Sequence, residues 1–258
     1  MLGQTRAQPA SKQSGVAEVS VVNVSKVFGH GAGAVAALDR VNLDVDPGEF
    51  VCLLGASGCG KSTLLNLVAG LDQPTSGSVH VRSNRTGLMF QEAALFPWLT
   101  VRGNVELALK LNGVARTQRR DRTDELLAMV HLDEFGKKRP HELSGGMRQR
   151  VALARALAQD AEVLLMDEPF GALDAMTRDR LHDELEGLWR STNKTVMFVT
   201  HNVREAVRLG DRVVLLASRP GRVAATFDID IPRPRRIDSP EVATRAAMIT
   251  DRLRAEAS

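Results

Sequence analysis

Tyrosine is missing from this sequence, and cysteine and tryptophan occur only twice each among 258 residues. The two cysteines, Cys52 and Cys59, have neither the spacing nor the histidine partners of a zinc site, so a reducing compartment is the default expectation. Long apolar runs are missing too, because stretches such as residues 163–166 and 213–217 are far too short to cross a bilayer. Any role at a membrane would therefore require another protein to hold the chain there.

Charge of one sign is also lacking. The chain has 34 Lys and Arg against 31 Asp and Glu, and its formal net charge is +3. Nucleic-acid-binding proteins usually concentrate basic residues on one face, so this mild excess gives no indication of a nucleic-acid partner. With 43% hydrophobic and 25% charged residues, the composition is that of a globular protein, and the length predicts one large α/β domain with at most a small appendage.

Strand-like and helix-like segments alternate along most of the chain. β-branched and apolar runs predict strands at residues 19–24, 41–45, 50–54, 87–90, 163–166, 195–200 and 212–217. Apolar residues at helical spacing predict helices at residues 61–69, 101–111, 116–130, 145–157, 176–189 and 202–209. This alternation indicates a parallel sheet covered on both faces. Residues 93–159 have little strand signal, and we interpret them as a helical subdomain inserted into the sheet domain.

The two ends of the chain are different in character. Residues 1–17 are small and polar, without the apolar segment of a secretory signal, and we expect a disordered tail there. Residues 18–218 form the expected main domain, and residues 219–258 a C-terminal extension. Within the extension we expect a pair of strands at residues 222–231, a linker at 232–236 and a helix at 240–257. The linker's Arg233, Arg235 and Arg236 are interpreted as solvated, with contact to lipid headgroups as the alternative.

The first motif with a chemical meaning fits the pattern G-x4-G-K-[ST] at residues 55–62. It stands between an apolar strand and a helix, so its backbone N–H groups converge on one point at the positive end of that helix and can hold phosphate. Lys61 would reach the β- and γ-phosphates of ATP, and Ser62 would bind Mg²⁺. The residues expected to bind the nucleotide are Gly55, Ala56, Ser57, Gly58, Cys59, Gly60, Lys61, Ser62 and Thr63.

Two carboxylates, Asp167 and Glu168, follow the buried strand at residues 163–166. In a sheet of this type an acidic strand end lies beside the phosphate loop, so Asp167 would hold Mg²⁺ and Glu168 would polarise the attacking water. Alone, the pair is equally compatible with a solvated strand end before a turn. Together with the phosphate loop it favours a catalytic role.

Residues 143–147, Leu-Ser-Gly-Gly-Met, begin a helix, with Ser144 as its N-cap and two glycines that leave the backbone open to a phosphate. With the preceding motifs, they make the chain resemble the ATP-binding subunits of ABC transporters over about residues 19–218. The resemblance implies a P-loop NTPase (RecA-like) α/β core with an antiparallel β subdomain and an inserted helical subdomain. It also implies a head-to-tail dimer, in which Ser144, Gly145 and Gly146 of one subunit meet the ATP bound by a second ATPase subunit, which we expect to be another copy of the chain.

Further positions match the family residue by residue. Gln91 matches a glutamine that touches Mg²⁺ and the attacking water, and His201 a histidine that contacts the γ-phosphate. Asp174 belongs to the loop that crosses the dimer interface, and Phe28 stands where an aromatic residue stacks on adenine. The resemblance thus implies Glu168, His201, Lys61 and Gln91 as catalytic residues and Ser62, Gln91 and Asp167 around the metal. From the residues alone, a histidine such as His201 is more often just a polar strand end. For Phe28 the alternative is a core or edge aromatic.

Departures from the family pattern point to a subgroup. Met147 replaces the usual glutamine and Gly171 the usual serine, while residues 90–98, 169–178 and 218–222 resemble importers of nitrate, taurine and aliphatic sulfonates. This implies transmembrane permease subunits as partners, indirect work with a solute-binding protein, and a peripheral position on the cytoplasmic face of the inner membrane.

Phe96, Pro97 and Trp98 would lie in the groove that receives a short permease helix, or alternatively in the core of the helical subdomain. An ABC-superfamily ATPase without a transport role is the other functional reading. Such proteins carry a long coiled-coil insertion or two ATPase domains in one chain, and neither is visible in this sequence. A non-hydrolysing regulatory module would be expected to have lost Glu168 or His201, and both are present.

Overall fold

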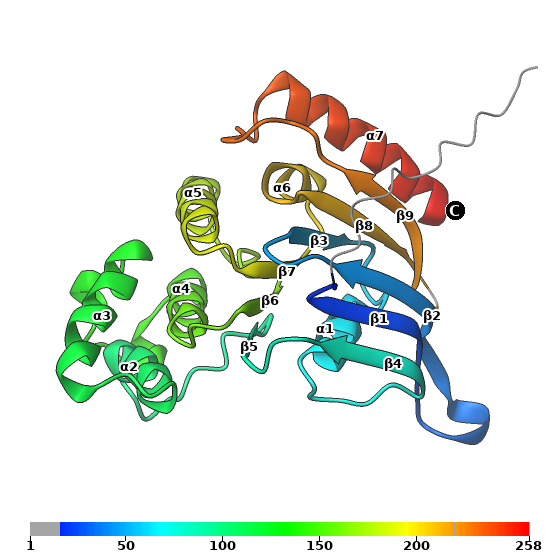
Figure 1. The fold of residues 1–258 in the computed structure, drawn as a ribbon. Coiled ribbons are helices and arrows are strands. Elements are labelled where there is room, and N and C mark those ends of the chain that lie inside the picture. The colour runs from blue at the N-terminus through cyan, green and yellow to red at the C-terminus, as the bar shows by residue number, and fades with distance from the viewer. Residues whose placement is uncertain (1–15, 219, 258) are drawn as a thin grey trace, which may run out of the picture.

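A six-stranded sheet forms the centre of the computed structural model, which describes residues 16–218 and 220–257 (Figure 1). The strand order is β5-β6-β7-β3-β8-β9, and every neighbouring pair is parallel except β8 and β9. β3, β6 and β7 are buried along their whole length, as the continuous apolar runs predict for parallel strands covered on both faces. The strands are β3 (Phe50–Leu54), β5 (Thr86–Met89), β6 (Val163–Asp167), β7 (Thr195–Thr200), β8 (Arg212–Ala217) and β9 (Arg222–Asp228).

A smaller antiparallel sheet lies beside the first, in the order β2-β1-β4. It consists of β1 (Val19–Phe28), β2 (Val35–Val45) and β4 (Ser76–Val81), with a short 3-10 turn, η1 (Gly31–Gly33), between the first two. α1 (Lys61–Val68) follows β3, and its apolar residues share one hydrophobic cluster with the small sheet and with one face of the central sheet. The start of α1 is therefore held between the two sheets.

The segment between β5 and β6 is helical. It contains α2 (Val101–Leu111), α3 (Arg116–Met129) and α4 (Gly145–Leu157), with the short turns η2 (Asp133–Phe135) and η3 (Pro140–Glu142). α2 and α3 stand to one side of the sheet, and α4 lies between them and the sheet (Figure 1). The helices α5 (Ala175–Thr192), α6 (Val203–Leu209) and α7 (Pro240–Ala257) complete the fold. No helix within the described residues combines the length and apolar character that a bilayer crossing requires.

Two expectations for the C-terminal extension are wrong. Residues 222–231 hold one strand, β9, which pairs with β8, and not a pair of strands. Residues 232–236 are not a solvated linker: Arg235 is 5% exposed and the Arg233 side chain 11%, whereas the Arg236 side chain is 82% exposed. The physical reason is that backbone carbonyls near the end of α6 accept hydrogen bonds from Arg235, and such carbonyls have no partner within their own helix. The expected tail at residues 1–17 lies almost wholly outside the described residues.

Candidate active site

The candidate site lies along the edge of the central sheet where four parallel strands end together. Register pairs Leu54 of β3 with Thr200 of β7, and Asp167 of β6 with Val199 of β7, so these strand ends are level. β5 continues the alignment on the far side of β6. The segments that follow the strands contain most of the predicted residues, namely residues 55–63, Gln91, Glu168 and His201.

The phosphate loop joins β3 to α1 and curls around Lys61, which is only 6% exposed. Its Nζ donates to the carbonyl oxygens of Gly55 at 2.8 Å and Ala56 at 3.0 Å. Gly60 has a φ of +93°, and a Cβ there would lie 2.8 Å from the carbonyl oxygen of Ala37, so this turn requires glycine. The ammonium group is thus already directed into the loop at the N-terminus of α1, where an anion is favoured.

Asp167 ends β6 with its side chain hydrogen-bonded to the Ser62 hydroxyl, which joins the strand end to the phosphate loop. The pKa of Asp167 is raised, first by burial and then by the nearby Glu168 charge. The hydrogen bond from the Ser62 hydroxyl and the charge of Lys61 oppose this shift. A buried carboxylate and a hydroxyl in contact supply the hard oxygen donors that Mg²⁺ prefers. The residues present therefore fit a magnesium ion at this point.

Glu168, Gln91 and His201 gather immediately beyond Asp167. Glu168 Oε2 accepts a hydrogen bond from Gln91 Nε2 at 3.4 Å and lies 3.2 Å from His201 Nδ1. The backbone of Glu168 has a φ of +46°, which is costly for a residue with a side chain, and its N–H donates to the Val199 carbonyl at 3.0 Å. Because the His201 side chain is 66% exposed, a carboxylate that can act as a base, an amide and an imidazole stand together beside solvent.

Ser144 is the N-cap of α4, and its hydroxyl accepts a hydrogen bond from the Met147 N–H at 3.2 Å. Gln149, one turn further on, donates to the Glu168 carbonyl at 2.9 Å and accepts from the Ala172 N–H at 2.8 Å. α4 is therefore tied to the segment that follows the catalytic acid. Among the described residues, the side-chain hydrogen bond of Ser144 stays within its own helix, so contact with the phosphate loop of the same chain does not explain its place.

Two further predicted residues lie apart from this cluster. Phe28 ends β1 in the small sheet, is 46% exposed and has Lys26 Nζ 5.0 Å from its ring centroid. Asp174 is the N-cap of α5, where its carboxylate accepts from the Thr177 N–H at 3.0 Å. Hydrogen bonding to that backbone N–H lowers the pKa of Asp174. A ring open to solvent suits adenine stacking, whereas Asp174 already has a capping role.

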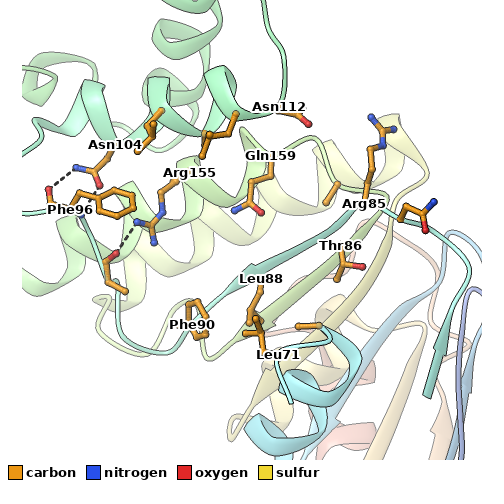
Figure 2. A pocket seen from close by; sticks show the side chains of 17 residues that line it. Leu71, Arg85, Thr86, Leu88, Phe90, Phe96, Asn104, Asn112, Arg155 and Gln159 are labelled. Atoms are coloured by element: carbon orange, nitrogen blue, oxygen red, sulfur yellow. Dashed lines mark hydrogen bonds between the residues drawn. The ribbon is translucent and has the colours of Figure 1, made fainter. Parts of the chain in front are cut away.

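A groove of about 630 Å³ begins beside the segment that follows Gln91. Figure 2 shows Leu71, Leu88 and Phe90 on one side of it and Phe96 with Arg155 on the other. Its wall also includes the exposed Leu111 of α2.

Two side chains hold the wall of this groove in place. Arg155 donates to the carbonyls of Ala93 and Ala94, and Asn104 holds the Phe96 backbone (Figure 2). Pro97 and Trp98 are exposed, so the alternative that places them in the core is wrong.

Sequence reasoning missed several polar residues around the site: the buried Gln149, His182 and Glu205, and the half-buried Arg155. His182 and Glu186 lie next to Leu181 and Leu185 on the buried side of α5, at the spacing of an apolar helix face. Polar residues at such positions were the available signal, because burying them is costly unless they find partners.

A phosphate loop between a parallel strand and a helix, with an acidic strand end bonded to it, defines a P-loop nucleoside triphosphatase with a RecA-like core. The family model described as ABC transporter matches residues 38–171. The nitrate import ATP-binding protein NrtD of Synechocystis sp. is 47% identical over 83% of each chain. The taurine import ATP-binding protein TauB of Rhizobium johnstonii is 50% identical over 77% of this chain and 79% of its own.

Among solved structures, the dimeric ATP-binding cassette MJ0796 in a post-hydrolysis state, bound to ADP and Pi, superposes with a TM-score of 0.76 at 36% identity. That match covers 83% of this chain and 100% of the cassette. The chain therefore belongs to the ABC transporter family and is an ATPase of the ATP-binding cassette type.

Proposed function

We propose that this chain is the ATP-hydrolysing subunit of an importer for a small oxyanion such as nitrate, taurine or an alkanesulfonate. The observation that carries the proposal is the apolar groove beside Gln91, which gives the catalytic edge a surface on which a permease helix can press. The names of its relatives, which are nitrate and taurine import proteins, support the solute class. The working position would be the cytoplasmic face of the membrane, with the permease as the anchor.

The site suggests how each group would act on ATP. Lys61 would give up its hydrogen bonds to two loop carbonyls and donate to phosphate oxygens of ATP, because carbonyl and phosphate oxygens are both acceptors for the same ammonium group. Mg²⁺, held by Ser62 and Asp167 with Gln91 nearby, would neutralise phosphate charge. Glu168 would accept a proton from the attacking water, and His201 would contact the γ-phosphate.

In the proposed enzyme, the residues of one chain form only half of each ATP site. Ser144 and Gly146 lie at the N-terminus of α4, where exposed N–H groups favour an anion. Within residues 16–218 and 220–257, however, the Ser144 hydroxyl is hydrogen-bonded only inside its own helix. A second copy of the chain, placed head to tail, would bring these groups to the γ-phosphate. The cassette MJ0796 is dimeric, which supports this arrangement.

The test is reconstitution with the permease and the solute-binding protein that the proposal requires, which we would seek among the products of the neighbouring genes. We expect co-purification, followed by ATPase activity in vesicles that rises when the binding protein carries nitrate, taurine or a short alkanesulfonate. Leu71→Glu and Leu111→Glu, at the exposed rim of the groove, should abolish co-purification and stimulation while basal hydrolysis persists. Met248→Glu, an exposed apolar residue of α7, is the matched control. Hydrolysis that needs no permease and ignores every solute would favour the ATPase without a transport role.

A further inference from the structure

A buried set of polar side chains lies behind the candidate site, among β7, α5, α6 and the segment after β9. We call it the His182 network, and each of its members is at most 5% exposed. It has no part in the proposed function as stated above, although burying such groups costs free energy unless every one is paired. Its members are Thr200, His182, Glu205, Arg208 and Arg235.

Arg235 fastens the end of α6. It donates to the carbonyl oxygens of Val207 at 2.9 Å, of Gly210 and of Ile231 at 2.7 Å. Burial lowers the pKa of Arg235 to about 10, so it stays a cation at neutral pH and complements the negative end of the helix. Its own carbonyl accepts a hydrogen bond from Arg208 Nε at 3.2 Å.

The direction of each hydrogen bond in the network follows from chemistry. Arg208 Nη1 lies 2.7 Å from His182 Nδ1, and because a guanidinium can only donate, Nδ1 must accept. Nε2 then carries the proton and donates to Glu205 Oε1 at 2.7 Å. The second carboxylate oxygen of Glu205 accepts from the Thr200 hydroxyl. Both nitrogens of the imidazole are thus hydrogen-bonded, one as an acceptor and the other as a donor.

The network ends at the turn that presents His201. Thr200 Oγ1 accepts a hydrogen bond at 2.9 Å from the N–H of Asn202, so the residues on both sides of His201 are joined. The His182 ring also meets the ring of Phe170 edge-on at 4.9 Å, in the segment that follows Glu168. His201 therefore lies between two residues that the network joins, and Glu168 lies two residues before a ring that packs against His182.

We propose that the His182 network positions His201 for hydrolysis and that residues 232–236 hold this network in place through Arg235. The C-terminal extension would then contribute to the ATPase activity. The inference rests on the role proposed for His201. A displacement of about 1 Å at a reacting group can cost about a hundredfold in rate, so loss of one link should slow hydrolysis. The contacts of Lys61 would stay intact, so ATP should bind as before.

The experiment compares two substitutions of His182 in the full chain. His182→Leu removes both hydrogen bonds, and we expect kcat to fall about tenfold while KM for ATP changes less than about twofold. His182→Gln keeps one donor and one acceptor on an amide, so we expect kcat to recover to within about twofold of the parent. Asp183→Asn, which alters an exposed partner of the same Arg208, should leave kcat unchanged.

A double-mutant cycle with His201→Ala separates positioning from general damage. If His182 acts through His201, His182→Leu will slow hydrolysis no further once His201 is absent. Thr200→Val breaks the same connection at its other end with little change in volume, and it serves if His182→Leu fails to fold.

Two results would overturn this inference alone. Equal fold-losses in the parent and in the His201→Ala background would do so, as would failure of His182→Gln to recover. If His201→Ala itself left hydrolysis unchanged, the proposed role of His201 and this inference would fall together.

Discussion

The edge of the central sheet and the His182 network behind it are built from the same kinds of side chain, but they use them in opposite ways. At the edge, the contacts of Glu168 with Gln91 and His201 are 3.4 and 3.2 Å long, and the His201 side chain is 66% exposed. In the network, the two bonds of the His182 ring are both 2.7 Å long and the ring is fully buried. Glu168, Gln91 and His201 thus keep long contacts that a ligand can replace, whereas the polar groups behind them are hydrogen-bonded to one another inside the protein.

This contrast predicts different costs of substitution. A change at the edge removes chemistry without disturbing packing, so the rate should fall while stability is kept. A change in the network leaves buried donors or acceptors unpaired, so stability should fall as well. Each of the experiments below could show that the edge and the network do not differ in this way.

The largest effect is expected for Glu168→Gln. It removes the base and leaves the shape, so we expect hydrolysis to fall about a thousandfold while ATP still binds and holds two copies of the chain together. Single-turnover hydrolysis, nucleotide binding and sedimentation measure the three quantities. Glu92→Gln, an exposed carboxylate close by in sequence to Gln91, is the matched control and should hydrolyse normally.

Near-normal turnover of Glu168→Gln would remove Glu168 from the mechanism. A large loss of thermal stability in the same variant would instead show that the edge is structural, and the comparison would fail at that point.

The edge was predictable from sequence because each of its parts is local. Residues 55–62 specify a loop, a helix start and a lysine within one stretch of chain, and strand ends gave Asp167, Glu168 and His201. What the sequence could not supply was the strand order that sets β7 between β3 and β6. That order brings His201 beside Glu168.

The network was not predictable in the same way, because its members come from four separate segments of the chain. Only the fold brings them within hydrogen-bonding distance of one another. Residues 232–236 have the composition of a solvated linker, and only the folded chain shows carbonyls near the end of α6 facing Arg235. The prediction of a pair of strands at residues 222–231 was wrong for a related reason. The single strand there, β9, pairs with β8, and its own pattern of alternation is too weak to fix its length.

The next effect in size is on stability and uses two neighbouring arginines. Arg235→Gln leaves several buried carbonyls unpaired, and we expect it to lower the free energy of unfolding by about 3 kcal/mol. Arg236→Gln changes a side chain that is 82% exposed, so its unfolding curve should match that of the parent. Denaturant unfolding of the full chain measures both. Equal curves for the two variants would mean that residues 232–236 behave as the solvated linker that their composition indicates.

The smallest effect is expected at Phe28, which combines features of both regions. Its ring is 46% exposed, as at the edge, but it packs beside Lys26, whose Nζ is bonded to Asp72 at 2.6 Å and to the Gln73 carbonyl at 2.8 Å. Stacking of a base on an aromatic ring contributes about 1–3 kcal/mol, so Phe28→Ala should weaken ATP binding about tenfold with kcat unchanged.

Phe28→Tyr keeps the stacking surface and should bind ATP as the parent does. Val35→Ala, at the exposed position paired with Phe28 in β2, is the control for damage to the small sheet. Titration with ATP and with a ribose triphosphate that lacks the base separates the two explanations. If Phe28→Ala weakened both ligands equally, the ring would support the sheet and would not read the base.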